Sequence, residues 1–158
     1  MKFSFKNIGY PLAWIIAFLG ISYFIGQVTQ ANMAWYADLP KSPLNPPRIA
    51  FPIAWTSLYI MLAVAGSLIF RAKGEGISKH KKLFAVYMLM NWAWSFIFFG
   101  AHMVTLGFVW IVLSALVLGV LILCLWRGSK KIAALLCIPT LCWSLFAAYL
   151  NGYIALMM

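Results

Sequence analysis

The polar side chains that could recognise a ligand are few, and they follow helical spacing. Asn91, Trp94 and Ser95 stand at positions i, i+3 and i+4 of a long apolar run, and Phe98 follows one turn later. In an α-helix these positions lie on one face. Amide, indole and hydroxyl groups on such a face can hydrogen-bond a bound molecule. For the Asn91 amide, a hydrogen bond to another helix is an equally good interpretation.

Two further stripes repeat this chemistry. Trp143, Ala147 and Asn151 are spaced at i, i+4 and i+8, and Trp55 and Tyr59 at i and i+4. If the three stripes face one another, they enclose an aromatic-walled cavity with amide and hydroxyl groups at fixed points. A site of this kind suits a flat, largely apolar ligand. For Asn151, as for Asn91, interhelical hydrogen bonding remains the alternative.

The sequence contains no motif typical of catalysis or metal binding by protein side chains. No carboxylate lies in an apolar run, so the usual intramembrane proton carrier and cation counter-ion are missing. The sequence has no H-E-x-x-H, P-loop or G-x-S-x-G motif and no Cys and His cluster at metal spacing. We therefore expect no catalytic residue, no metal site and no required cofactor. Chemistry carried by a ligand, such as light absorption by a bound pigment, needs none of these groups.

Composition indicates the element that positions these stripes. The chain is 65% hydrophobic and 9% charged, with a mean hydropathy of +0.95. Such values are typical of a lipid-embedded chain. A helix crosses the ~30 Å hydrocarbon layer in about 20 residues. We predict an all-α integral membrane protein in which residues 1–158 form one five-transmembrane-helix bundle, with helices near 8–29, 49–70, 83–101, 107–126 and 132–154.

The segment 30–48 is predicted to be a stiff lid over the cavity. Five prolines fall between Trp35 and Trp55, at Pro40, Pro43, Pro46, Pro47 and Pro52. Proline fixes φ and removes an amide donor. We therefore expect neither helix nor central strand between Trp35 and Trp55.

The basic residues predict an orientation. Ten of the twelve lie in the N-terminus and in the loops 71–82 and 127–131, whereas Lys41 and Arg48 lie in the lid. Because cytoplasmic loops collect Lys and Arg, we expect a cytoplasmic N-terminus and an extracytoplasmic lid and C-terminus, in the inner membrane of a bacterium. No basic residue falls inside a span, so the net charge of +10 indicates a lipid surface and no nucleic acid partner.

Other residues receive structural interpretations. Ser144, Ala148 and Gly152 share one helix face and predict close helix packing. His102 falls at the predicted turn between the third and fourth helices, where we expect a solvated interfacial side chain. A further group of aromatic residues is assigned to the interfacial belts, namely Tyr10, Trp14, Trp110, Trp126 and Tyr153.

With these motifs the chain resembles the tryptophan-rich sensory protein or translocator protein family (TspO/MBR), also called the peripheral-type benzodiazepine receptor family. The lid pattern of that family is matched by Trp35, Tyr36, Leu39, Lys41, Pro46 and Pro47, and the second-helix pattern by the run 51–59. The third-helix pattern is matched by Asn91, Trp94, Ser95, Phe98 and Phe99, and the fifth-helix pattern by Pro139, Trp143, Ala147, Leu150 and Asn151.

The resemblance implies a protein, often dimeric, that binds porphyrins such as protoporphyrin IX beneath the first loop. Ligand contacts would come from the lid residues Trp35, Tyr36, Pro46 and Pro47 and from the wall residues Trp55, Tyr59, Asn91, Trp94, Ser95, Phe98, Trp143, Phe146, Ala147 and Asn151. One function class is a porphyrin-binding sensor or translocator that aids light-dependent porphyrin breakdown, with Trp35 as the nearest oxidisable side chain. The other is a scaffold that modulates partner membrane proteins without turnover.

Overall fold

A computed structural model of the protein describes residues 5–158, with side chains from Ile8 onward. Lys2 and the side chain of Lys6, part of the predicted charge asymmetry, lie outside what is described. The long helices are α1 (Phe5–Ala31), α3 (Ala50–Arg71), α4 (Ile77–Ser95), α5 (Val104–Arg127) and α6 (Lys131–Met157). A short helix α2 (Met33–Asp38) follows α1, and a π-helical turn η1 (Phe96–Gly100) continues α4.

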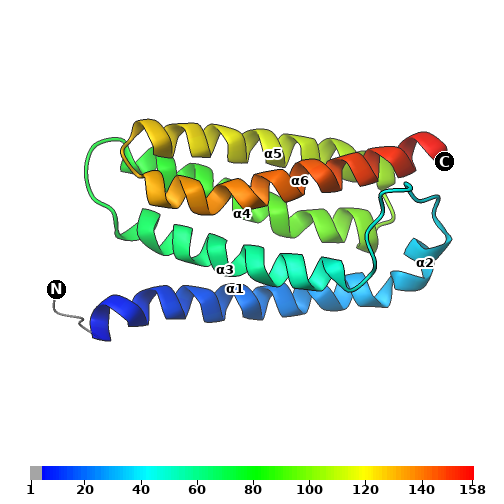
Figure 1. Ribbon diagram of the computed structural model, residues 1–158, viewed down its shortest axis with the longest axis horizontal. Coiled ribbons are helices and arrows are strands. Elements are labelled where there is room, and N and C mark those ends of the chain that lie inside the picture. Colours follow the sequence, from blue (N-terminus) through cyan, green and yellow to red (C-terminus); the bar gives the residue numbers. More distant parts are fainter. Residues whose placement is uncertain (1–4) are drawn as a thin grey trace.

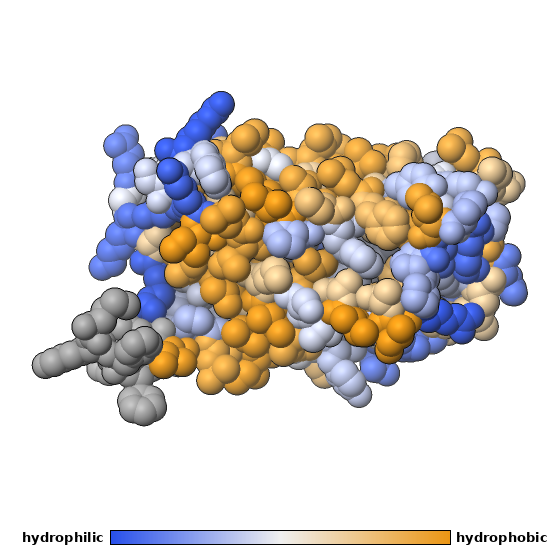
Figure 2. Space-filling model, viewed as in Figure 1, coloured by the Kyte–Doolittle hydropathy of each residue, from blue (hydrophilic) through white to orange (hydrophobic). Residues whose placement is uncertain are grey.

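The five long helices match the predicted membrane-spanning bundle. Each is long and apolar enough to cross a membrane, η1 being counted with α4. Figure 2 shows a broad hydrophobic band between two hydrophilic ends. Large apolar side chains face outward within this band, for example Leu116 and Leu123, which are 62% and 58% exposed. Lipid, rather than water, is the solvent that such a surface requires.

The long helices run side by side in a ring (Figure 1). Helix α3 packs between α1 and α6, α5 packs between α6 and α4, and α4 with η1 meets α1 to complete the ring. The α3–α4 and α5–α6 connections lie at the end of the bundle where α1 begins, while α2 and the C-terminus lie at the other end. The basic loops therefore share the end where α1 begins, and the C-terminus lies at the other end, as five spans require.

The helices extend beyond the predicted bounds, most of all in α4. This helix begins at Ile77, six residues before the predicted start at position 83, and includes Lys79, Lys81 and Lys82. Hydropathy locates the membrane-embedded part of a helix, and a helix once nucleated gains a hydrogen bond with each added residue. Gly76 precedes the first turn with φ of +74°, a backbone conformation that glycine adopts without strain.

The prediction of no helix between Trp35 and Trp55 was wrong at both ends, whereas the predicted helix near 49–70 matches the start of α3 within one residue. Trp35 to Asp38 belong to α2, and α3 begins at Ala50. The prolines explain why both helices are permitted. Pro40 is the first of them and follows α2, while Pro52 falls in the first turn of α3, where an amide has no helical acceptor to lose. Only residues 39–49 are free of helix as expected.

Two of the tryptophans assigned to interfacial belts serve as packing residues instead. The Trp14 ring lies against Phe70, with ring centroids 5.0 Å apart, and against Phe18 at 5.5 Å. Trp110 donates its indole N–H to the Met90 carbonyl of α4 at 2.8 Å and so links α5 to α4. Sequence alone could not distinguish these positions, because an indole suits both a membrane interface and a buried contact.

Candidate functional site

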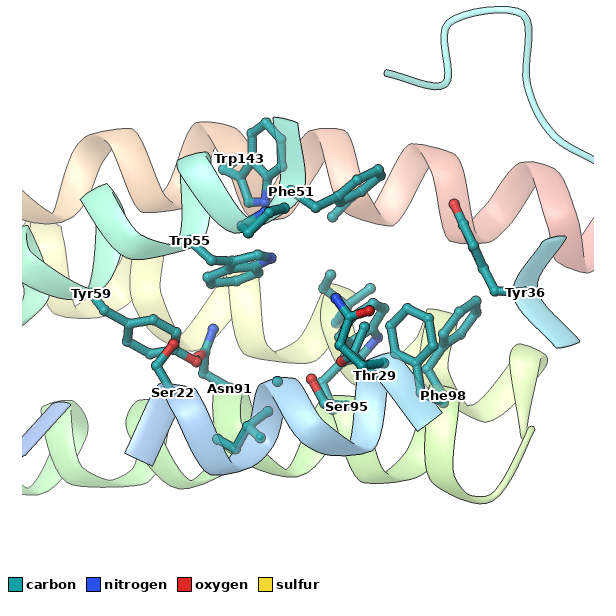
Figure 3. A pocket seen from close by; sticks show the side chains of 18 of the residues that line it. Ser22, Thr29, Tyr36, Phe51, Trp55, Tyr59, Asn91, Ser95, Phe98 and Trp143 are labelled. Atoms are coloured by element: carbon teal, nitrogen blue, oxygen red, sulfur yellow. The ribbon is translucent and has the colours of Figure 1, made fainter. Parts of the chain in front are cut away.

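A cavity of about 530 Å³ lies inside the ring of helices, toward the end that carries α2 (Figure 3). This volume falls within the ~300–1,000 Å³ typical of small-molecule sites. Every long helix contributes to its lining, and so do α2 and η1. The cavity is thus a product of the whole bundle.

The three predicted stripes converge on this cavity. Figure 3 shows Phe51, Trp55 and Trp143 opposite Ser95 and Phe98, with Tyr36 near the α2 end and Tyr59 and Asn91 together at the other. Ten of the predicted site residues line the cavity, namely Tyr36, Trp55, Tyr59, Asn91, Trp94, Ser95, Phe98, Trp143, Ala147 and Asn151.

The other four predicted site residues lie outside the lining. Trp35 stacks on His102, with ring centroids 4.0 Å apart, and meets the edge of Phe98. Phe146 packs edge-on against Trp143 and stacks on Tyr149, so it supports a lining ring from behind. Pro46 and Pro47 shape the loop before α3 and do not line the cavity.

Trp35, predicted as the oxidisable side chain nearest to a ligand, is not among the tryptophans that line the cavity. These are Trp55, Trp94 and Trp143. Trp35 lies in a helix, so consecutive residues point in different directions. Tyr36 faces inward in its place.

His102 makes specific contacts, although its side chain is exposed as expected. Its Nε2 lies 2.8 Å from the Asn32 Oδ1, and its ring stacks on Trp35. Its φ of +56° turns the chain sharply between η1 and α5. The turn between these spans is thereby fastened to the junction of α1 and α2.

Lys41 holds the lid segment in shape. Its ammonium donates to the backbone carbonyls of Tyr36, Ala37 and Leu39, with Nζ–O distances of 2.7, 2.7 and 3.0 Å. Carbonyls at a helix C-terminus lack intrahelical donors, and a cation there also meets the negative end of the helix dipole. The six-residue helix α2 therefore has its cap within the lid itself.

The lid segment is also bonded to itself and to α6. The Tyr36 hydroxyl donates to Asn45 Oδ1 at 3.1 Å. Burial raises the pKa of Tyr36, so its hydroxyl keeps the proton that this bond uses. The hydroxyls of Ser42 and Tyr149 lie 2.8 Å apart and join the loop to α6.

Asn91 makes the interhelical hydrogen bond that was considered for it, and it also lies in the cavity lining. Its Oδ1 accepts a hydrogen bond from the Tyr59 hydroxyl of α3 at 2.9 Å, and its Nδ2 donates to the Tyr87 hydroxyl at 3.2 Å. The side chain lines the cavity at the same time. These bonds leave the second lone pair of Oδ1 and the second N–H of Nδ2 without a partner among the described residues.

The aromatic wall on α4 is fixed in place by one hydrogen bond and one stack. Trp94 donates its indole N–H to the Gly107 carbonyl of α5 at 3.1 Å, and its ring lies nearly parallel to Phe98 with centroids 5.1 Å apart. A Cβ on Gly107 would lie 3.1 Å from both the Phe98 ring and the Asn151 Oδ1, so η1, α5 and α6 approach one another closely at this glycine. The π-helical turn that carries Phe98 is a feature that often marks functional sites.

Two buried polar atoms in the lining have no partner among the described residues. The Trp143 Nε1 is a donor without an acceptor, and the Asn151 Oδ1 is an acceptor without a donor. The Asn151 amide nitrogen does donate, to the Val104 carbonyl at 3.0 Å, which fixes the side chain. An unpaired buried group costs about 1–3 kcal/mol, and both atoms are buried in the cavity wall with almost no accessible surface.

Sequence reasoning missed the contribution of α1. This helix supplies lining residues that include Ser22, Gly26, Gln27, Thr29 and Gln30. Their polarity within an apolar run was the available signal, since polar residues in spans usually face the bundle interior. Arg48, just before α3, and Ser114 on α5 also line the cavity.

Comparison with known proteins gives a consistent result. The TspO/MBR family model matches residues 5–157. Tryptophan-rich protein TspO of Chlorobaculum tepidum is 36% identical over 139 residues, which cover 84% of this chain and 85% of that protein. The translocator protein of Ovis aries is 36% identical over 138 residues, covering 85% and 78% respectively.

A relative of nearly the same length gives the longest of these matches. Tryptophan-rich protein TspO of Archaeoglobus fulgidus is 33% identical over 155 residues, which cover 96% of this chain and 98% of that protein. The names of these relatives describe translocator and tryptophan-rich proteins, not classical enzymes. A family match from end to end, combined with five membrane-spanning helices around an aromatic cavity, shows that this chain belongs to the TspO/MBR family of membrane proteins.

Proposed function

We propose that the protein binds a porphyrin, such as protoporphyrin IX, in the cavity beneath α2 and acts as a membrane sensor or translocator of this ligand. The observation that carries the proposal is the aromatic wall. Trp55, Trp94 and Trp143 come from three different helices and line one cavity of about 530 Å³. Flat rings on several sides favour a flat, largely apolar molecule.

Polar side chains in the lining support a ligand that also has polar groups. Ser22, Gln27 and Asn91 line the cavity among the aromatic residues. A porphyrin has pyrrole N–H groups and carboxylate oxygens on an otherwise apolar body. In this proposal the porphyrin is the ligand and not a permanent cofactor.

A titration of the purified protein with protoporphyrin IX tests the proposal. Saturable quenching of tryptophan fluorescence, with a shifted absorbance band of the bound pigment, is the expected result, because three tryptophans line the cavity. Trp126 lies outside the lining at 47% exposure, so Trp126→Phe is the matched control and should quench as fully as the parent. Quenching that rises linearly without saturation would reject the site.

Breakdown of the bound porphyrin that depends on light and on molecular oxygen, the oxidant, is a further part of this proposal. The pigment itself absorbs the light, so no catalytic side chain is required. Because Trp55 lines the cavity and Trp35 does not, Trp55→Phe should slow the loss of porphyrin under illumination more than Trp35→Phe. An equal rate of loss for the parent and both variants would show that the protein only binds the pigment.

The proposed orientation places the lid segment outside the cytoplasm. Its support is the shared end of the basic loops 71–76 and 127–131, opposite α2 and the C-terminus (Figure 1). A reporter fused after Met158 should be active only if the reporter works outside the cytoplasm. Activity of a reporter that works only in the cytoplasm would reverse the orientation.

A further inference from the structure

Among the residues that line the cavity, Arg48 alone carries a charge. It lies two residues before α3, at the end of the lid loop, and its side chain is exposed. Within residues 8–158 no hydrogen bond or ion pair engages its guanidinium. The cavity therefore has a neutral body and one cation at its edge.

One cation and one anion lie near Arg48 in or beside the lid loop, namely Lys41 and Asp38. Lys41 is the other basic residue of the lid segment, and its ammonium is occupied by three backbone carbonyls. Burial lowers the pKa of Lys41, the nearby positive charge of Arg48 lowers it further, and Asp38 acts in the opposite direction. Arg48 and Lys41 are thus close enough to repel each other. A ligand carboxylate, in addition to the Asp38 carboxylate, would relieve that repulsion.

We propose that Arg48 is a specificity residue that selects ligands with a carboxylate at one edge of a flat apolar body. This inference rests on the proposed function, since it concerns the same cavity. A guanidinium presents paired N–H donors that match the two oxygens of a carboxylate. In a porphyrin the propionate edge would then face Arg48, while the apolar edge lies among the aromatic rings.

The test compares protoporphyrin IX with its dimethyl ester, in which both carboxylates are neutral. The parent protein, Arg48→Gln and Arg48→Lys are placed in nanodiscs of phosphatidylcholine, which has no net charge. Each ligand is compared between parent and variant, so that differences in its partition into lipid cancel. The matched control is Arg127→Gln. It removes the same charge from the C-terminal end of α5, where the side chain lies outside the cavity lining.

Arg48→Gln should weaken binding of the acid by about threefold, the size expected for a solvent-exposed ion pair. Binding of the ester should not change. Arg48→Lys should restore part of the loss, because the charge returns without the paired donors. The effect of Arg48→Gln on the acid should shrink in 1 M salt, where charges are screened within ~3 Å.

Two results would overturn the inference, and they differ from failure of the proposed function. Equal weakening of acid and ester in Arg48→Gln would show that this side chain only shapes the cavity. An equal loss with Arg127→Gln would show a general effect of net charge on an anionic ligand. If neither ligand binds the parent protein saturably, the proposed function itself fails.

Discussion

The two ends of the bundle use the same helices in opposite ways. Toward the end of the basic loops, Leu62, Ala63, Leu121 and Ala134 have no exposed surface, so α3, α5 and α6 pack closely around them. At the end of α2, flat rings and unpaired polar atoms surround a cavity. Both ends contain aromatic side chains, but around Leu62 the rings of Phe18 and Phe84 are buried in the core, whereas Trp55, Trp94 and Trp143 line open space.

Helix α3 shows the change within a single element. Its first part presents Phe51, Trp55 and Tyr59 to the cavity, and the part that follows buries Leu62 and Ile69. The hydrogen bond from Tyr59 to Asn91 lies at the boundary. We therefore expect substitutions at the filled end to change stability, and substitutions at the cavity end to change ligand affinity.

The largest expected effect is at the filled end. Leu62→Ala should lower the free energy of unfolding by about 2–5 kcal/mol, because the side chain is fully buried and leaves a void. Porphyrin affinity of the folded fraction should stay unchanged. Thermal unfolding with and without ligand measures both. Leu123→Ala, at a lipid-facing position that is 58% exposed, should cost far less, and equal losses would contradict the comparison.

Ala147→Leu tests the cavity end with the next largest effect. The added side chain would occupy ligand space, and overpacking of a close-fitting site costs ~1–3 kcal/mol. Porphyrin affinity should fall about tenfold, which corresponds to ~1.4 kcal/mol. The control is Ala85→Leu, at an exposed position of α4 outside the lining. Unchanged affinity in a folded Ala147→Leu protein would exclude this wall from the site.

Two glycines allow a matched test of packing. A Cβ on Gly66 would lie 2.6 Å from the Trp14 ring and 2.9 Å from Phe84, whereas a Cβ on Gly26, in the cavity lining, meets nothing within 4 Å. The clash in Gly66→Ala should outweigh the gain in helix propensity. The net loss of stability should be about 1 kcal/mol. Gly26→Ala should be neutral or stabilising by up to ~1 kcal/mol. The measurement is the melting temperature of each variant. Shifts in the same direction for Gly66→Ala and Gly26→Ala would contradict the difference in packing between the two sites.

Asn91→Leu examines the boundary and has the smallest expected effect. It removes the acceptor of the buried Tyr59 hydroxyl, so stability should fall by the ~0.6 kcal/mol average for membrane hydrogen bonds. Porphyrin affinity should change little if the bond between helices is the main function of this amide. Both quantities are measured on the same preparation. A strong loss of affinity with unchanged melting temperature would instead make Asn91 a ligand contact.

The five spans and three stripes were predictable because each depends on local composition or on helical period. Hydropathy identified the spans, and the spacing of Trp143, Ala147 and Asn151 identified a face. What could not be predicted depends on contacts between distant residues. The inward direction of Tyr36, the stack of Trp35 on His102 and the part played by α1 all follow from packing that no single segment encodes.

The hydrogen bonds that cap α2 can form before the long helices pack together. The bonds from Lys41 and Tyr36 that shape the lid segment join residues at most nine positions apart, and loops of about ten residues close in ~10–100 ns. The bond between Ser42 and Tyr149 joins residues 107 positions apart and must wait for α6. The lid segment can therefore form early and remain intact as a unit.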